Sequence, residues 1–321
     1  MSRLAALLLA CALPLAGWAQ AGTVHRIGML ETTSELANRA NLEAFRKGLR
    51  EAGYVESENY VIDYRSADGR ADRFPQLAHE LVGAGAEVVV TRGFAAARAA
   101  KEAGAAAVVM ATSADPVAAG VVKSLAHPGG NVTGLTTLVS ELAGQRIGIL
   151  KELAPQAKRV AAMLNLGNPT AAAERRQVES AAKAHHIEAL IFDVRSLEGL
   201  QRSLEAAAQK SVDALLINGE AVLLANRATI LEFARRHRLP VMYAAREYVE
   251  GGGLIAYGVS YPHLYYRAAS YVERILKGAK PGDLPIEKPN KMYLVINVSA
   301  ATALGIPIPS KLLLRADELI R

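Results

Sequence analysis

The chain has 321 residues, which is long for a single hydrophobic core and predicts two domains. Hydrophobic residues make up 51% and aromatic residues 5%, which favours Ala-rich helices packed on Val/Ile strands over an all-β sandwich. The charged fraction of 21% excludes general disorder. The formal net charge is +6, but the basic residues are dispersed and do not support nucleic-acid binding.

The first 21 residues differ in character from the rest of the chain. Arg3 precedes the apolar run Leu4–Leu15, and Gly17-Trp18-Ala19-Gln20-Ala21 follows it. This order is typical of a signal peptide over residues 1–21, so we expect a periplasmic protein. A retained anchor and lipidation at Cys11 remain alternatives, although the apolar run is short for a membrane span. Cys11 is the only cysteine, so the mature chain would have neither a disulfide nor a thiolate nucleophile.

Apolar runs alternate with amphipathic helical stretches through the first half of the chain. Strands are predicted at Arg26–Leu30, Tyr60–Tyr64, Glu87–Thr91, Ala106–Ala111 and Val132–Leu135. Helices are predicted at Asn41–Ala52, Phe74–Val82, Ala95–Glu102 and Ala118–Leu125. Successive βα units of this kind require a parallel sheet that is covered by helices on both faces.

The second half restarts the same pattern. Strands are predicted at Arg159–Leu164, Ala189–Val194, Ala214–Ile217 and Val241–Tyr243, and helices at Ala171–Ala184, Leu197–Ala208 and Leu223–His237. The segment Ile62-Asp63-Tyr64-Arg65-Ser66 resembles Phe192-Asp193-Val194-Arg195-Ser196, about 130 residues later. Chance similarity between simple βα units is the alternative, but the shared order of elements favours duplication.

Later elements suggest that the chain crosses between the two halves more than once. A strand at Gly253–Val259, a helix at Leu264–Leu276 and a strand at Tyr293–Asn297 follow the second half. We therefore expect an α/β fold of two similar doubly wound parallel-sheet domains joined by a multi-strand hinge. The expected N-terminal domain is 22–136 plus about 262–288, and the expected C-terminal domain is 137–261 plus about 289–321. A ligand would lie between the carboxyl ends of the two sets of strands.

Several motifs of catalysis and cofactor binding are missing from the sequence. No GxGxxG, Walker A or GxSxG sequence follows a predicted strand. Ser180-Ala181-Ala182-Lys183 has the letters of an SxxK motif, but it lies inside an Ala-rich helix. His185 and His186 are adjacent, so on a helix they point apart and cannot chelate one metal together. The sequence therefore predicts no catalysis, no cofactor and no metal.

The stretch His127-Pro128-Gly129-Gly130-Asn131-Val132-Thr133-Gly134 is the most distinctive in the chain, a turn that enters a buried strand. Together with Asp115-Pro116-Val117, Gly251–Gly258, Leu294–Asn297 and Ala303–Pro309, it resembles the ABC transporter substrate-binding family that includes tryptophan/tyrosine-type binding proteins. The resemblance spans essentially the whole mature chain. It implies a type I periplasmic-binding-protein fold with three inter-domain crossings, and a monomer that delivers a small molecule to an ABC permease and its ATPase.

The loops that follow the strands are the candidate ligand-binding segments, and the duplication selects them in pairs. The candidate residues are Thr33, Ser34, Thr91, Gly93, Phe94, Thr112, Ser113, Asp115, Thr137, Asn165, Asn218, Tyr243, Arg246 and Tyr257. Hydroxyls and backbone N–H groups at helix starts suit a carboxylate, and aromatic rings could enclose an apolar body. Each hydroxyl could instead be an ordinary helix cap, and Arg246 could instead pair with Glu247 or Glu250. Tyr261, Tyr265 and Tyr266 are expected to be packing residues.

The predicted function is capture of an amino acid, an aromatic compound or a small carboxylate by domain closure, for delivery to an ABC importer. A periplasmic sensing module that docks on a receptor is the alternative. The loop Asn218-Gly219-Glu220 is where an amino group would be recognised, and it differs from the corresponding loop of the aromatic-amino-acid binders in the family. The identity of the ligand therefore stays open. A transcription regulator of the same fold would need an N-terminal helix-turn-helix, where this chain has its predicted signal peptide.

Overall fold

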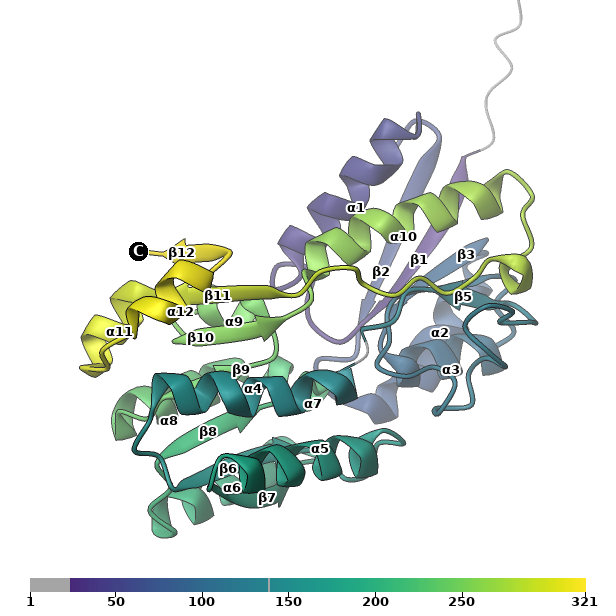
Figure 1. Ribbon diagram of the computed structural model, residues 1–321. Coiled ribbons are helices and arrows are strands. Elements are labelled where there is room, and N and C mark those ends of the chain that lie inside the picture. Colours follow the sequence, from purple (N-terminus) through teal and green to yellow (C-terminus); the bar gives the residue numbers. More distant parts are fainter. Residues whose placement is uncertain (1–23, 138) are drawn as a thin grey trace, which may run out of the picture.

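The computed structural model describes residues 24–137 and 139–321, so the predicted signal peptide and Cys11 lie outside the described residues. Figure 1 shows two α/β domains, each built on its own parallel sheet, which confirms the predicted fold class. Within the described ranges, no helix is both long enough and apolar enough to span a membrane.

The N-terminal domain is built on a parallel sheet in the order β2-β1-β3-β4-β5. Its strands are β1 (His25–Glu31), β2 (Tyr60–Ser66), β3 (Val88–Arg92), β4 (Val108–Thr112) and β5 (Val132–Gly134). Its helices are α1 (Arg39–Glu51), α2 (Phe74–Gly83) and α3 (Phe94–Glu102), with the short 3₁₀ turn η1 (Ala71–Arg73) before α2. Every residue of β3 and β4 is buried, as expected for central strands covered on both faces.

The C-terminal domain repeats this topology and then extends it. Its strands are β6 (Arg159–Leu164), β7 (Glu188–Asp193), β8 (Ala214–Ile217), β9 (Val241–Tyr243), β10 (Ile255–Gly258), β11 (Tyr293–Asn297) and β12 (Glu318–Ile320). The order β7-β6-β8-β9-β10 reproduces β2-β1-β3-β4-β5, which supports the predicted duplication. Strand β11 then joins β10 in antiparallel orientation, and β12 adds to β11 at the edge.

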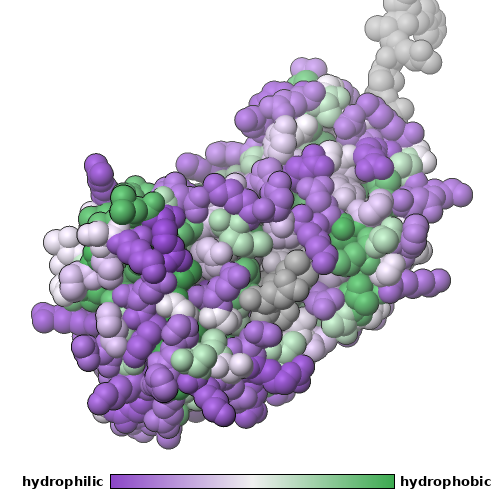
Figure 2. All heavy atoms as spheres, in the orientation of Figure 1, coloured by the Kyte–Doolittle hydropathy of each residue, from purple (hydrophilic) through white to green (hydrophobic). Residues whose placement is uncertain are grey.

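The helices of the C-terminal domain cover both faces of its sheet (Figure 1). They are α4 (Val139–Leu153), α5 (Ala171–Ala184), α6 (Leu197–Gln209), α7 (Ala221–Ala225), α8 (Arg227–His237), α9 (Arg246–Glu250), α11 (Val298–Leu304) and α12 (Ser310–Arg315). Most of the visible surface is polar (Figure 2). Apolar side chains gather where α11 and α12 lie, where Leu314 is 87% exposed, and in a second area over the N-terminal domain.

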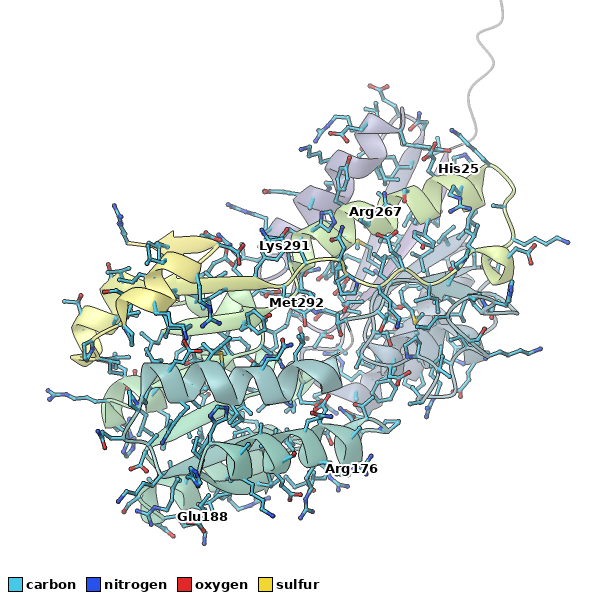
Figure 3. All side chains as sticks on the ribbon, in the orientation of Figure 1. His25, Arg176, Glu188, Arg267, Lys291 and Met292 are labelled. Atoms are coloured by element: carbon cyan, nitrogen blue, oxygen red, sulfur yellow. The ribbon has the colours of Figure 1, made fainter. Side chains whose placement is uncertain are left out.

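The chain passes between the domains after β5, after β10 and before β11. After β10, helix α10 (Tyr261–Leu276) returns to the N-terminal domain and lies against α1, so closely that a Cβ on Gly48 would come 2.7 Å from Ala269 Cβ. The 3₁₀ turn η2 (Pro281–Asp283) follows, and Glu287 forms a parallel bridge with Leu135. Figure 3 labels Arg267 on α10, and Lys291 and Met292 on the final connection to β11. The exact domain limits stay a prediction.

Two predicted helices differ from the structure. The segment predicted as a helix at Ala118–Leu125 is a series of turns. Gly120 has φ +68°, and the carbonyls of Ala119 and Val121 accept hydrogen bonds from the side chains of Arg98 and Lys101 instead of from helical N–H groups. The predicted helix Leu223–His237 is divided into α7 and α8 at Asn226, whose side-chain amide donates to Val222 O at 2.8 Å.

Helix α4 was not predicted from the sequence. Its buried positions include Leu142, Ile147 and Leu150, but Arg146 is also buried, at 1% exposure. Gly144 and Gly148 interrupt the pattern further. A buried charge and two glycines mask the regular apolar stripe by which an amphipathic helix is recognised.

Candidate functional site

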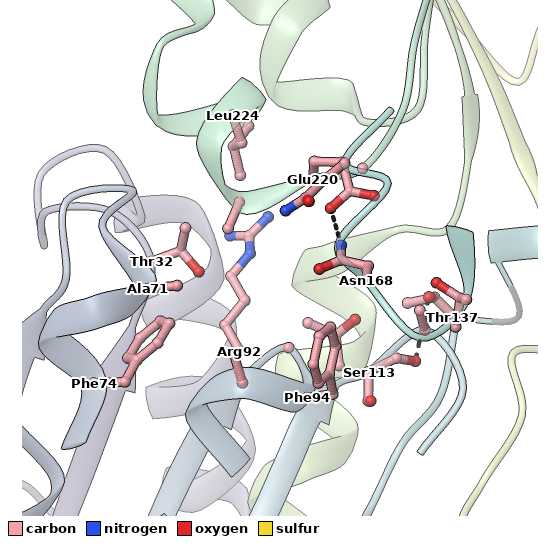
Figure 4. Close-up of a pocket in the computed structure, with 18 of the residues that line it drawn as sticks. Thr32, Ala71, Phe74, Arg92, Phe94, Ser113, Thr137, Asn168, Glu220 and Leu224 are labelled. Carbon is pink, nitrogen blue, oxygen red and sulfur yellow. Dashed lines mark hydrogen bonds between the residues drawn. The ribbon is translucent and has the colours of Figure 1, made fainter. Parts of the chain in front are cut away.

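A cavity of about 120 Å³ lies between the carboxyl ends of the strands of the two domains (Figure 4). The N-terminal domain and its connections contribute Thr32, Ala71, Phe74, Arg92, Gly93, Phe94, Ala95, Thr112, Ser113, Ala114, Thr137 and Tyr261. The C-terminal domain contributes Asn165, Asn168, Thr170, Glu174, Gly219, Glu220, Ala221 and Leu224. This is the position that the topology of a doubly wound sheet predicts for a ligand.

The N-terminal wall presents neutral hydrogen-bond donors. Gly93 ends the β3 turn with φ +83° and stands at the N-cap of α3, where it has no side chain to cap the helix. The first N–H groups of α3, at Phe94 and Ala95, therefore lie at the cavity without a side-chain cap. Ser113 is 1% exposed, and its Oγ has no hydrogen-bond partner among the described residues. A buried hydroxyl beside the start of a helix suits an anionic group.

Aromatic and aliphatic side chains line the same cavity. Phe74 comes from the start of α2, Phe94 from the start of α3, and Leu224 reaches in from α7 on the other domain (Figure 4). Phe74 is 2% exposed, whereas Phe94 is only partly buried and has the guanidinium of Arg98 5.8 Å from its ring centroid. These side chains suit a ligand with an apolar body.

The C-terminal wall presents amides and carboxylates. Asn168 Nδ2 donates a hydrogen bond to Glu220 Oε2 (Figure 4). Glu174, on the first turn of α5, accepts from Asn218 Nδ2 at 2.8 Å and from Thr170 Oγ1 at 3.5 Å. Both carboxylates are largely buried, at 2% exposure for Glu174 and 8% for Glu220.

Burial makes both carboxylates harder to ionise. Burial, and then repulsion by Glu174, raise the pKa of Glu220 to about 8. Burial also raises the pKa of Glu174, against the opposing effects of Asn218 and Arg146. Arg146 donates from Nε to Tyr257 O at 2.7 Å, and burial lowers its pKa to about 10. Glu174 therefore has a cation behind it, whereas the side chain that bonds Glu220 is a neutral amide.

Arg92 connects the two domains at one end of the cavity. Its Nη2 lies 3.0 Å from Glu247 Oε1 on α9, its Nη1 donates to Asn38 Oδ1 at 3.2 Å, and its guanidinium lies 4.5 Å from the ring centroid of Tyr261. Burial opposes the charge, but Glu247 and the neighbouring Tyr265 keep the pKa of Arg92 above its ordinary value. Arg92 is thus a cation that already has its counter-charge.

Six of the residues proposed from the sequence line this cavity: Gly93, Phe94, Thr112, Ser113, Thr137 and Asn165. The other proposed residues are absent from its lining: Thr33, Ser34, Thr91, Asp115, Asn218, Tyr243, Arg246 and Tyr257.

Most residues of the second group have a structural partner elsewhere. The carbonyl oxygen of Thr33 accepts a hydrogen bond from Tyr64 Oη, and Ser34 Oγ accepts one from Ala37 N. Asp115 Oδ1 accepts hydrogen bonds from the N–H groups of Val117 and Ala118, at the start of the series of turns that replaces the predicted helix. These contacts were not readable from the residue types alone.

The buried members of this group lie behind the wall instead of on it. Thr91 lies inside β3 at 0% exposure, and Asn218 holds Glu174 from behind. Tyr243 stacks on Tyr248 with ring centroids 4.7 Å apart, and Tyr257 contributes its carbonyl to Arg146. Asn218 therefore holds a residue of the cavity lining, whereas the partly buried Tyr257 contributes a backbone carbonyl and not its side chain.

Arg246 has its counter-charges at the surface. Its Nη2 lies 2.6 Å from Glu318 Oε1 on β12, and it also pairs with Glu250 one turn along α9. Arg246 lines a separate hollow with Tyr293 and Pro262. The surface pairing was one of the two alternatives for this residue.

The loops selected from the sequence contribute to the lining of this cavity, but the sequence reasoning missed several side chains in them. Arg92, Asn168 and Glu220 lie in strand-end loops that the sequence indicated. Glu174 and Phe74 are on helices, where no strand-end rule points to them. Tyr261 is buried as expected for a packing residue, but it also lines the cavity. In the described part of the chain, no cluster of three or more His, Cys, Asp or Glu side chains could hold a metal.

Known proteins are similar to this chain over most of its length. A family model described as ABC transporter substrate binding protein matches residues 26–320. The tyrosine-binding protein of Clostridioides difficile (strain R20291) is 24% identical over 278 residues, which is 85% of this chain and 80% of the relative.

Two solved structures superpose over nearly the whole chain. A conserved domain protein from Vibrio cholerae O1 biovar El Tor is 29% identical with a TM-score of 0.84, covering 92% of this chain and 100% of that one. An ABC domain from Streptococcus pneumonia, in complex with L-Trp, is 26% identical with a TM-score of 0.83, and the match covers 93% of this chain and 100% of that one.

Proposed function

Because the chain belongs to the ABC transporter substrate-binding protein family, we propose that it captures an aromatic amino acid between its two domains and delivers it to an ABC importer. The family is a class of extracytoplasmic solute-binding proteins and not of enzymes. The observation that carries the choice of ligand is the opposite chemistry of the two cavity walls: helix N–H groups and Ser113 on one, Glu174 and Glu220 on the other.

In the proposed complex, the carboxylate of the amino acid lies at the start of α3. It accepts hydrogen bonds from the N–H groups of Phe94 and Ala95 and from Ser113 Oγ, which has no other partner among the described residues. The ammonium group lies against Glu220, with the amides of Asn165 and Asn168 beside it. Phe74 and Phe94 contact the aromatic ring.

The named relatives support the aromatic class. One is called a tyrosine-binding protein and one was solved with L-Trp, and both match over most of their lengths. The loop Asn218-Gly219-Glu220, from which the sequence left the ligand open, supplies a carboxylate at the cavity. A carboxylate is the group that an ammonium requires, so this loop is compatible with an amino acid.

Calorimetry and thermal shift on the mature protein test the ligand class. L-Tyrosine and L-tryptophan should bind with one site per chain and raise the melting temperature, since at 100 times Kd a ligand stabilises the folded state by about 2.7 kcal/mol. Glucose and succinate should have no effect. A shift with one of these and none with any aromatic amino acid would contradict the proposal.

Delivery to an importer needs a separate test. Deleting the gene should lower uptake of the bound amino acid by the bacterium, and uptake should return with the wild-type gene. Unchanged uptake combined with loss of a transcriptional or motility response to the amino acid would favour the sensing role.

A further inference from the structure

The two carboxylates of the C-terminal wall differ in how their charges are balanced. Burial raises the pKa of Glu174, the positive charge of Arg146 opposes this rise, and Asn218 and Thr170 donate hydrogen bonds to its two carboxylate oxygens. Glu220 has neutral partners, the side chain of Asn168 and the backbone at Asn165, and Glu174 repels it. In residues 24–137 and 139–321, no salt bridge includes Glu220.

The opposite wall does not supply the missing cation. Arg92 is the basic residue that lines the cavity from the N-terminal domain, and Glu247 and Asn38 hold its guanidinium. The other titratable side chain facing from that domain is Tyr261, whose ring stacks on Arg92 and whose pKa burial raises. Closing the two domains therefore encloses a carboxylate that has amide partners but no opposite charge.

An enclosed carboxylate without a counter-charge is costly, whereas one in an open, hydrated cleft is not. This free-energy cost opposes domain closure, because closure brings the N-terminal wall over Glu220. It can be removed by a cation on the ligand or, in the empty cleft, by a proton.

We propose that Glu220 makes closure selective, by opposing it until a cationic group of the ligand lies against its carboxylate. The inference rests on the proposed function for the identity of that cation, the ammonium of the amino acid. For the ligand-free protein, the inference does not depend on the identity of the ligand and requires only the two domains and Glu220. A ligand that fills the cavity but carries no cation binds without closing the domains.

The empty protein should therefore close as the solution becomes more acidic. In this structure, where the N-terminal wall lies over Glu220, burial and then repulsion by Glu174 raise its pKa from the ordinary value of 4.5 to about 8. We expect the part of this rise that comes from burial by the N-terminal wall to be lost when the domains open. The closed form binds the proton more tightly, so protonation favours closure fully below the lower value, and this contribution is lost as pH rises through the higher one. Between the two values the ratio of closed to open protein changes by up to about tenfold per pH unit.

The distance between the domains can be measured directly. Since Cys11 is the only cysteine and lies in the predicted signal peptide, the mature chain can carry spin labels at Glu102→Cys on the N-terminal domain and Arg176→Cys on the C-terminal domain. Both positions are exposed, and Figure 3 shows Arg176 on the outer surface of α5.

In the first experiment, pulsed electron resonance follows the ligand-free protein from about pH 9 to about pH 5. The closed population of the wild type should rise as pH falls, and Glu220→Gln should remove most of this dependence and be more closed than the wild type at pH 8. Glu198→Gln, at an exposed position of α6, should follow the wild type. A wild type whose distances do not change with pH, or a Glu220→Gln curve that overlays it, would overturn the proposal.

In the second experiment, L-tyrosine is compared at pH 8 with 3-(4-hydroxyphenyl)propionate, which lacks only the ammonium. L-Tyrosine should close the wild type, and the deaminated compound at saturation should leave it open while closing Glu220→Gln. Equal closure of the wild type by both compounds refutes the inference but leaves the proposed function intact. If L-tyrosine does not bind at all, the proposed function fails, and the ligand-free series still decides the role of Glu220.

Discussion

The two domains of this protein share one strand order, but the walls they present to the cavity differ in chemistry. The loop after β3 ends in the uncapped start of α3, and the equivalent loop after β8 ends in Glu220. Thr112 and Ser113 at the end of β4 line the cavity, whereas Tyr243 at the end of β9 is buried and stacks on Tyr248. The comparison teaches that a duplicated topology fixes where the loops lie, and that the residues in each copy then set the chemistry of its wall.

The added strands of the C-terminal domain explain part of this difference. Glu318 on β12 pairs with Arg246, directly after the loop that corresponds to Thr112 and Ser113. The N-terminal sheet has no equivalent of β12 among the described residues. Arg246, paired with a residue of the added strand, is absent from the lining of the cavity.

Removing the charge from the C-terminal wall should have the largest effect. Glu220→Gln should weaken binding of the aromatic amino acid by about 100-fold, or about 2.7 kcal/mol, because the ammonium is left without its opposite charge in an enclosed site. Calorimetry at pH 8 measures this. Glu198→Gln should bind as the wild type does, and a Glu220→Gln protein with unchanged affinity would show that the walls do not differ as described.

Steric obstruction of the contact between the two walls should have the second-largest effect on ligand binding. Gly69 has φ +77°, and a Cβ there would lie 2.5 Å from Ala225 Cβ on the other domain. Gly69→Ala should weaken ligand binding by about 30-fold, since overpacking costs about 2 kcal/mol and here opposes closure.

Gly85→Ala is the matched control for this variant. Gly85 has a similar φ of +83°, but no atom lies within 4 Å of its Cβ position. Both variants should lower the melting temperature through backbone strain, and only Gly69→Ala should lose affinity. Ala225→Gly should restore part of the loss, and equal affinities in both alanine variants would refute the steric explanation.

The aromatic surface of the N-terminal wall should contribute less. Phe94→Ala should weaken L-tyrosine binding by roughly tenfold, corresponding to about 1.4 kcal/mol for one aromatic contact. Phe233→Ala, on α8 and away from the cavity, removes the same side chain without touching the ligand. If both variants bind equally well, the ring of the ligand does not lie at Phe94.

The neutral donor on the N-terminal wall should have the smallest effect. Ser113→Ala should weaken binding by roughly fivefold, the value of one hydrogen bond of about 1 kcal/mol. Ser180→Ala, on an exposed position of α5, is the control and should bind normally. A Ser113→Ala loss as large as that of Glu220→Gln would reverse the assigned order of the walls.

The sequence by itself determined the fold class and indicated which strand-end loops line the cavity between the domains. Buried Val-rich strands alternating with amphipathic helices, such as the one carrying Leu42, Phe45 and Leu49, require parallel sheets with helices on both faces. The repeated order of elements then placed Gly93, Ser113 and Asn165 at strand ends that face one another. These features follow from the local periodicity of apolar residues, which can be observed directly in the sequence.

Only the tertiary structure decided which side chain of each loop faces the cavity. Arg246 follows a strand as Ser113 does, but it pairs with Glu318, which is 72 residues later in the chain. Tyr243 ends a strand, and its ring stacks on Tyr248 of the next helix. Glu174 lies on a helix and reaches the site because α5 begins at the cleft, with Arg146 from α4 behind it. Such partners are brought together by long-range packing, so the charge balance around Glu220 exists only in the folded chain.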